Sequence, residues 1–294
     1  MANHHFGNYG DVWKHLLLAE ILLEEQPGFV LESHAGSACY EVTPEAEREH
    51  GVGHYLNVCN KSGELVGARF TRLLRNLHKR EGGEKIYPGS PLIDLRVCAE
   101  HRPQYIFCDI DEESLATIRE AAELLEVPTE NVQLSADDGV LTIAGALEEL
   151  DELQRLGTLV IVDPFDLFEK NAAGLSSLDL FGTAASSGAM ALLWYAYGGS
   201  GPTQEEVHQA LLGLSRRHEL DHAEMWWAEL ALTAAAEGGP WSEMLPGCGM
   251  VLAGLGKACL RRCTALSESL AATYATCEVP GGAAGRLALT RPQP

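Results

Sequence analysis

Short apolar segments alternate with amphipathic segments through the middle of this 294-residue chain, and this alternation limits the possible folds more than any other property. The apolar segments at 105–111, 132–138 and 158–165 have the length of β-strands, and the segments between them have helical periodicity. Uninterrupted apolar runs such as AMALLWYAY, at 189–197, indicate strands buried on both faces. The alternation therefore predicts an α/β fold with a mostly parallel sheet and helices on both faces.

A helix and a strand are predicted before this region. Residues 11–25 have apolar side chains at helical spacing, with Asp11 as a plausible N-cap and Pro27 and Gly28 at the end. The following segment, FVLESHAGSACY, combines a short apolar strand with a turn of small residues. A doubly wound α/β domain begins its ligand-binding crevice in this way.

Residues 41–89 fit no alternation of strand and helix, and we predict a small helical insertion within a single domain spanning residues 1–294. The second half of this segment places basic residues on one helix face and apolar residues on the opposite face. This helix is either a solvated amphipathic helix or a contact surface for phosphates. Its basic residues are Arg69, Arg72, Arg75, Lys79 and Arg80. Two late strands, MWWAELALTA and GCGMVLAGL, are predicted near the C-terminus, the last one antiparallel.

The composition argues against several classes of function. The net charge of −21 repels polyanions and so disfavours RNA as a partner, although an acidic proteome would explain the charge equally well. There is no run of about 18 apolar residues and no signal peptide pattern, so a cytoplasmic location without membrane contact is expected. The eight cysteines form no C-x-x-C pair and the eleven histidines no ligand pattern, so no metal is expected.

Polar and small residues follow the predicted strands at the positions where such sheets bind ligands. Asp109 or Asp111 fits a carboxylate that accepts ribose hydroxyls. Asp138 fits an acceptor for an adenine amino group, and Gly139 would let the ring approach the backbone. The turn after the first strand supplies two further candidates, His34 and Gly36. Together these residues predict a site for a cofactor that contains a nucleoside.

The order of the motifs GNYGDVWKH, SHAG, YPGSPLI, ADDG, LVIVDPF, LLWY, AEL and GCGM resembles the RlmJ-type family. That family methylates the exocyclic amine of an adenine in large-subunit ribosomal RNA with S-adenosylmethionine. The resemblance runs through nearly the whole chain. It implies a Rossmann-like class I methyltransferase fold, with a mostly parallel seven-stranded sheet and a helical insertion after the first strand.

The resemblance also implies roles for individual residues. The family's cofactor contacts fall on His15, His34, Ser90, Asp109, Asp138 and Gly139. Its catalytic aspartate falls on Asp163, and Lys14 matches a family lysine beside the site. Without the resemblance, Lys14 and His15 would be interpreted as helix packing residues.

The loop after residue 162 departs from the family pattern Asp-Pro-Pro-Tyr, because it consists of Asp163, Pro164, Phe165 and Asp166. The family aromatic ring stacks on a flipped base, which an anionic side chain cannot do. A desolvated carboxylate needs a cationic partner, so Asp166 suggests a substrate with an amine or ammonium group. Alternatively, a one-residue deletion makes Phe165 the stacking ring.

The sequence therefore favours an S-adenosylmethionine-dependent enzyme that acts on a small amine or amino acid, with Asp163 and Asp166 orienting the nucleophile. In a variant, the amino group of S-adenosylmethionine attacks its own aminobutyryl chain. The alternative is a ribosomal RNA adenine N6-methyltransferase with a divergent loop. In either case, Trp194 and Tyr195 are expected to line the substrate pocket with Pro164 and Phe165.

Overall fold

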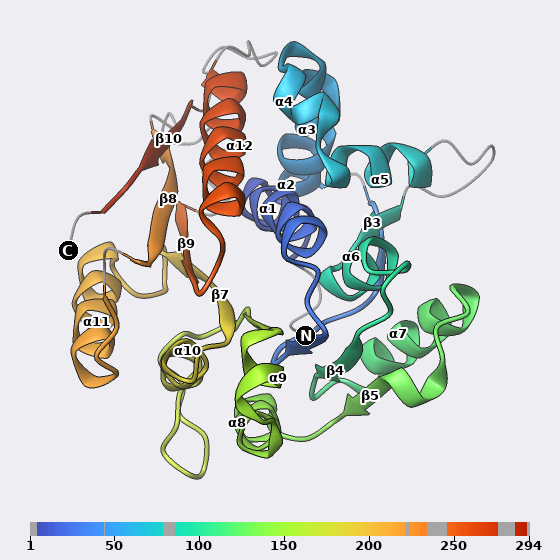
Figure 1. Cartoon of the computed structure of the whole chain (residues 1–294). Helices are drawn as coiled ribbons and strands as arrows, with labels where there is room; N and C mark the ends of the chain where they lie inside the picture. Colours follow the sequence, from blue (N-terminus) through green and yellow to red (C-terminus); the bar gives the residue numbers. More distant parts are fainter. Residues whose placement is uncertain are drawn as a thin grey trace.

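A twisted sheet forms the centre of the computed structural model, which describes residues 5–43, 45–78, 86–221, 224–233, 246–275 and 286–292 (Figure 1). These residues contain an eight-stranded sheet with the order β10-β8-β9-β7-β6-β1-β4-β5. The parallel strands are β5 (Val132–Ser135), β4 (Gln104–Cys108), β1 (Phe29–Glu32), β6 (Thr158–Val162) and β7 (Met190–Tyr197). The strands paired antiparallel are β9 (Gly247–Ala253), β8 (Trp226–Thr233) and β10 (Arg286–Thr290).

The topology confirms the predicted fold. Five parallel strands, with the antiparallel β9 between β7 and β8, have the strand order of a Rossmann-like class I methyltransferase. The antiparallel direction of β9 is confirmed as well. The central sheet of the described residues has one strand more than the seven predicted, because β10 pairs with the free edge of β8.

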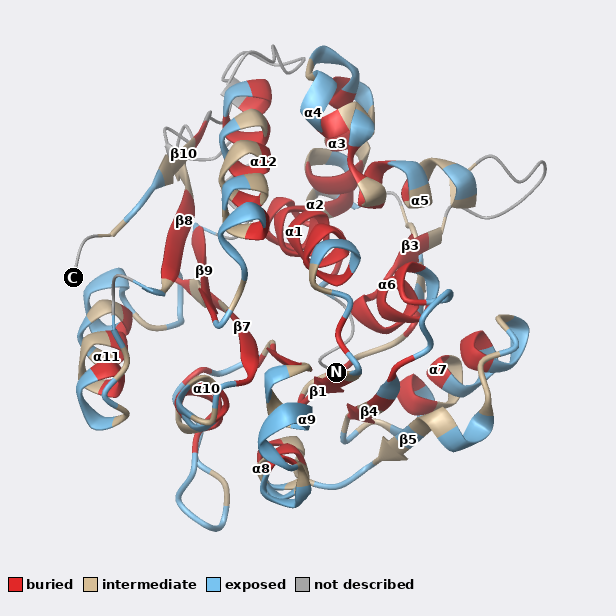
Figure 2. Cartoon of the chain, viewed as in Figure 1, coloured by how far each residue is buried: buried red, intermediate tan, exposed pale blue. Residues whose placement is uncertain are grey.

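Helices cover both faces of the sheet and enclose two apolar cores (Figure 2). One face carries α1 (Tyr9–Glu25), α5 (Arg69–His78), α6 (Ser90–Val97), α7 (Glu112–Leu124) and α12 (Lys257–Ala275). The other face carries α8 (Gly139–Glu149), α10 (Ser177–Ser186) and α11 (Gln204–Arg217), with the short α9 (Glu152–Leu156) before β6. Alternate side chains of each central strand enter opposite cores, as strand geometry requires.

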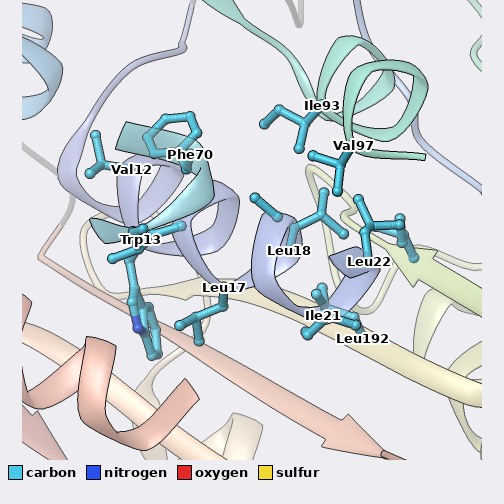
Figure 3. Packing of buried hydrophobic residues seen from close by; sticks show 14 of the residues in the cluster. Val12, Trp13, Leu17, Leu18, Ile21, Leu22, Phe70, Ile93, Val97 and Leu192 are labelled. Atoms are coloured by element: carbon cyan, nitrogen blue, oxygen red, sulfur yellow. The ribbon is translucent and has the colours of Figure 1, made fainter. Parts of the chain in front are cut away.

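Helix α1 is buried almost throughout its length, which is unusual for a helix on the face of a sheet. Its apolar residues pack against Phe70 of α5, Ile93 and Val97 of α6, and Leu192 of β7 (Figure 3). The helix begins two residues before the predicted start. Its N-cap is Asn8, whose side chain accepts a hydrogen bond from the backbone N–H of Asp11, so the prediction of Asp11 as the N-cap is wrong. The carboxyl group of Asp11, inside the first turn, is therefore free of the capping role and can contact other side chains.

The segment after β1 is mainly helical. Between the paired strands β2 (Cys39–Glu41) and β3 (Ile86–Pro88) lie α2 (Ala46–Arg48), a π-helical turn (Glu49–Gly53), α3 (His54–Val58), a 3₁₀ turn (Cys59–Lys61), α4 (Gly63–Gly67) and α5. In α5, Phe70 and Leu74 are buried and Arg72 is exposed. Arg75 donates a hydrogen bond to Asn60 Oδ1 at 2.6 Å. The predicted basic residues Lys79 and Arg80 lie outside the described residues.

Helices in the described ranges are all too short or too polar to cross a lipid bilayer.

Candidate functional site

The carboxyl ends of the parallel strands bring together most of the predicted site residues. His34 follows β1, Asp109 follows β4, Asp138 and Gly139 follow β5, and Asp163 follows β6. Parallel strands end at one edge of a sheet, which is where open α/β folds bind ligands. The segments that were far apart in the sequence therefore form one site at this edge.

Asp109 shapes the turn after β1. Its Oδ2 accepts a hydrogen bond from the backbone N–H of Gly36, and its Oδ1 accepts one from the backbone N–H of Asp111, both at 2.8 Å. Gly36 has a φ of +66°, a left-handed conformation that favours glycine. Asp111 is the N-cap of α7 and accepts a hydrogen bond from Ser114 Oγ at 2.9 Å. Both acids therefore hold the local backbone, Asp109 at the turn after β1 and Asp111 at the start of α7. Asp109 stays a candidate for the ribose acceptor because it lies directly at the end of β4.

Asp138 and Gly139 form the start of α8. Asp138 is the N-cap and accepts hydrogen bonds from the backbone N–H of Leu141 at 2.9 Å and from Asn171 Nδ2 at 3.3 Å. A Cβ on Gly139 would lie 1.9 Å from the carbonyl oxygen of Ser33. The glycine is therefore required by the packing of α8 against the end of β1, a reason that differs from the predicted approach of a ring to the backbone.

Two exposed apolar side chains flank these aspartates and were not predicted as site residues. Ile110, between Asp109 and Asp111, is 83% exposed, and Leu141 in the first turn of α8 is 42% exposed. An exposed apolar side chain can cover one face of a planar ring while a neighbouring carboxylate accepts hydrogen bonds from the same ligand. Ile110 could have been found from the sequence, because it is a single apolar residue between two acids in the motif DID. We had assigned this motif to the end of the strand.

Lys14 of α1 meets Asp163 at the end of β6. Its ammonium is buried, forms an ion pair with Asp163 and donates a second hydrogen bond to Asp11 Oδ1 at 3.2 Å. It also lies 5.3 Å from the centre of the Trp194 ring. Burial disfavours the charge, but the two carboxylates outweigh burial and raise the pKa of Lys14 above its usual value. Burial raises the pKa of Asp11, and Lys14 opposes this rise.

The loop after Asp163 differs from what the sequence suggested. Pro164 is buried, whereas the Phe165 ring is 85% exposed. Asp166 is exposed, and its Oδ1 accepts a hydrogen bond from the backbone N–H of Phe168 at 2.8 Å. The expectation that Asp166 is a desolvated carboxylate in need of a cationic partner is therefore wrong, because water and the loop backbone solvate it.

An open cavity of about 610 Å³ adjoins this loop. Asp166 and Phe168 belong to this loop, Ser200 and Pro202 to the segment before α11, and Glu205 and Gln209 to α11 itself.

Trp194 and Tyr195 lie on opposite faces of the sheet, because neighbouring strand residues alternate. Trp194 faces Lys14, and its buried Nε1 has no hydrogen-bond partner among the described residues. Tyr195 is 1% exposed and donates a hydrogen bond to Glu229 Oε1 at 2.6 Å, while Trp227 Nε1 donates to Tyr195 at 2.7 Å. The structure thus brings Trp194 to the candidate site and does not bring Tyr195 there, which contradicts the prediction for Tyr195.

We expect Tyr195→Phe to lower the free energy of unfolding by about 1–3 kcal/mol, because it removes a donor to the buried Glu229 and the acceptor for Trp227. The KM for substrate should stay unchanged. Thermal unfolding and steady-state kinetics measure the two effects. A several-fold rise in KM without loss of stability would show that Tyr195 lines the substrate pocket, as the sequence predicted.

The two predicted histidines and Ser90 lie close to the same edge. His15 is buried with Nδ1 2.8 Å from Tyr87 Oη, and burial, with a smaller effect of Lys14, lowers its pKa. His34 Nδ1 is 2.8 Å from Ser33 Oγ, and burial lowers the pKa of His34. Both rings are neutral at pH 7. Ser90 begins α6 and donates a hydrogen bond to Glu32 Oε2 at 2.8 Å. Across the described ranges, no three His, Cys, Asp or Glu residues form a metal-binding group.

Comparisons with known proteins found relatives in sequence and in structure. No family model matches the chain. The chain is 24% identical to the ribosomal RNA large subunit methyltransferase J of Haemophilus influenzae over 174 residues, 55% of this chain. The match spans only 58% of that relative's length.

Two solved structures extend the comparison. A Legionella pneumophila protein assigned to DUF519 has a TM-score of 0.71 at 19% identity, covering 98% of both chains. An rRNA methylase from Streptococcus thermophilus has a TM-score of 0.39 at 12% identity, covering 83% of this chain and 95% of its own, which is too distant to support an argument. The likeness to the Legionella protein extends through the whole described fold. The two chains therefore share a fold, and the strand order of the sheet is that of the class I methyltransferases.

Proposed function

We propose that this chain is an S-adenosylmethionine-dependent methyltransferase that acts on the exocyclic amine of an adenine-type base in RNA. The observation that carries the proposal is the arrangement at the end of β6, where a carboxylate held by Lys14 is followed by a buried proline and an exposed aromatic ring. The Haemophilus relative, a ribosomal RNA methyltransferase by name, supports the same substrate class.

The residues present fit the cofactor. Asp109 lies where a carboxylate accepts ribose hydroxyls, and exposed Ile110 beside it offers an apolar surface for the adenine ring. Asp11, Lys14 and Asp163 combine two acids with one ammonium, and this excess of acidic groups suits a sulfonium cation. When bound there, S-adenosylmethionine supplies an electrophilic methyl group.

The side chains after β6 orient the acceptor amine. Lys14 holds one oxygen of Asp163, so the other oxygen accepts an N–H of the amine and aims the nitrogen lone pair. Phe165 stacks on the ring of the base, and buried Pro164 stiffens the turn between carboxylate and ring. Positioning of this kind provides most of the catalysis in an in-line methyl transfer.

A neutral aromatic amine suits this site better than an alkylamine, which the sequence had favoured. An alkylammonium has a pKa near ~10 and must lose a proton before it can attack. An Asp163 that took this proton would lose its ion pair with Lys14, and Asp166 lies in a solvated turn. An exocyclic amine on a base is neutral and needs only orientation.

One observation favours the small-molecule alternative, including cyclisation of S-adenosylmethionine itself. The net charge of −21 opposes the approach of RNA unless basic residues such as those of α5 contact the phosphates. Salt separates the two cases, because RNA binding through several phosphates weakens steeply with added salt, whereas turnover of a small molecule responds little.

Mass spectrometry tests the proposed function. Purified protein is incubated with S-adenosylmethionine alone and with protein-free large-subunit ribosomal RNA. We expect methyladenosine in the RNA and no cofactor breakdown in its absence. Methylthioadenosine formed without an acceptor would instead support cleavage or cyclisation of the cofactor, and methylation of small amines but not RNA would support the alternative.

We expect Phe165→Ala to lower kcat/KM for RNA by about 5- to 150-fold, because stacking of a base on an aromatic ring contributes about 1–3 kcal/mol. Stability should be unchanged, since the ring is 85% exposed. Phe165→Tyr is the matched control and should retain activity. Equal kcat/KM for the alanine variant and the native protein would rule out Phe165 as the stacking ring.

A further inference from the structure

The loop between β6 and α10 is tied to the rest of the fold at one point. Residues 168–170 and 172–175 are exposed, and Asn171 between them is half-buried. Asn171 Nδ2 donates a hydrogen bond to Asp138 Oδ1 at 3.3 Å. In the described part of the chain, no other hydrogen bond joins residues 168–175 to residues outside the loop. This contact therefore links the loop that begins at Asp163 with the start of α8.

The side-chain amide of Asn171 is held in one orientation. Its Oδ1 accepts hydrogen bonds from the backbone N–H groups of Ala173 at 3.0 Å and of Leu175 at 3.1 Å. The backbone N–H of Asn171 donates to the carbonyl oxygen of Leu175 at 2.9 Å. Because two donors fix the oxygen end of the amide, its nitrogen must be the end that meets Asp138. Asn171 is thus a donor that its own turn holds in place.

Asp138 receives its donors on a single oxygen. The backbone N–H of Leu141 donates to Oδ1 at 2.9 Å, and Asn171 donates to the same atom. Among the described residues, no donor reaches Oδ2. Two donors that approach from different segments of the chain fix the rotamer of the carboxyl group. Asp138 therefore presents one free oxygen, Oδ2, and a carboxylate oxygen only accepts hydrogen bonds.

The surroundings of this oxygen suit the edge of an adenine ring. The exposed side chains of Leu141 and Ile110 offer apolar contacts for the faces of a planar ring. The amino group at position 6 of adenine donates to a carboxylate. In hypoxanthine a carbonyl oxygen replaces this amino group, and a carboxylate repels it because both are acceptors. The selection of the amino group then depends on how firmly Oδ2 is held toward the ligand.

We propose that Asn171 is a positioning residue that orients Asp138 and thereby sets the preference of the site for a cofactor with a 6-amino purine. The inference rests on the proposed function in so far as the cofactor is S-adenosylmethionine. Asn171 acts through Asp138, and it belongs to the loop that also carries Asp163 and Phe165. The segment that orients the acceptor amine therefore also supports recognition of the cofactor.

Isothermal titration calorimetry with two ligands tests the inference. S-adenosylhomocysteine carries the 6-amino group, whereas S-inosylhomocysteine has a carbonyl oxygen at this position and the same ribose and amino acid. The native protein should bind S-adenosylhomocysteine at least about 10-fold more tightly, because a site built to bind an N–H group rejects an analogue that lacks it. The ratio of the two affinities is the informative quantity, since general damage to the loop weakens both ligands alike.

Asn171→Asp is the decisive variant. The new carboxylate keeps an oxygen for the N–H groups of Ala173 and Leu175, so the turn is retained. It replaces the donor to Asp138 by a second carboxylate, and the two acids repel each other. We expect S-adenosylhomocysteine to bind about 10- to 100-fold more weakly, as for loss of a hydrogen bond to a charged group, and S-inosylhomocysteine within about 3-fold of the native affinity.

Two further variants separate the causes. Asn171→Ala removes the donor without adding a charge, so it should lower the preference for S-adenosylhomocysteine in the same direction by a smaller factor. Ala172→Ser, at the exposed neighbouring position, is the matched control and should leave both affinities within about 2-fold of the native values. Binding of S-inosylhomocysteine also verifies that each variant is folded.

The possible failures are distinguishable. If neither ligand binds the native protein, the proposed function fails. If the native protein binds both ligands equally well, Asp138 does not select the amino group and the inference is wrong. If Asn171→Asp weakens both ligands by the same factor, or weakens neither, Asn171 does not orient Asp138. In these last two cases the inference fails and the proposed function stands.

Discussion

Asp163→Asn is expected to lower kcat for methyl transfer by at least about 100-fold while leaving the affinity for S-adenosylhomocysteine nearly unchanged. The asparagine can still accept from Lys14, so the loop should keep its conformation. Its amide, however, then turns an N–H toward the acceptor amine, where two donors face each other. Misplacement of a reacting group by about 1 Å costs roughly 10²-fold in rate.

Single-turnover methylation of the RNA substrate measures this effect, and calorimetry measures cofactor affinity. Asp166→Asn is the matched control, because Asp166 is an exposed acid three residues along the same loop. The control should retain activity within about 3-fold. If the two variants lost activity equally, the loop as a whole and not the Asp163 carboxylate would be the orienting element.

Lys14→Met is expected to lower the free energy of unfolding by about 3–5 kcal/mol, the effect of removing one partner of a buried ion pair. Lys14 is the cation between Asp11 and Asp163, and its side chain is only 7% exposed. The variant leaves two acids in a buried site without a counter-charge. Methionine has a similar volume, so lost packing contributes little.

The deficit of Lys14→Met should depend on pH in a defined direction. Burial already raises the pKa of Asp11, and loss of Lys14 raises it further. When the pKa of an acid is higher in the folded state than in the unfolded state, the acid costs no stability at low pH, where it is protonated in both states. The free energy of unfolding falls as the pH rises through the folded-state pKa. The variant should therefore lie closer to the native protein at pH 5 than at pH 8.

Thermal unfolding of both proteins at the two pH values measures this difference. Lys170→Met, which removes an exposed lysine, is the control and should change stability by no more than about 0.5 kcal/mol. An identical deficit for Lys14→Met at pH 5 and pH 8 would show that the lost contacts of the lysine chain, and not the uncompensated acids, cause the destabilisation.

Errors in the sequence-based site have physical causes that can be named. Trp194 and Tyr195 were assigned together, although strand alternation places neighbours on opposite faces, and Tyr195 bonds with Glu229 on the far side. Asp166 was treated as a desolvated acid because it stands where the family loop has an aromatic residue. Its exposure depends on how the loop leaves the sheet, which no local pattern contains.

The sequence by itself determined the alternation of strands and helices, and with it the sheet and the edge where His34, Asp109, Asp138 and Asp163 meet. These features follow from hydrophobic periodicity and from the geometry of parallel strands, both of which act over short stretches of chain. Only the tertiary structure brought Lys14 to Asp163, 149 residues away, and Ser90 to Glu32. Such contacts depend on how α1 and α6 pack on the sheet. The charges of the site are therefore set by packing between distant segments, because the cost of burying an acid is decided by the neighbours that the fold supplies.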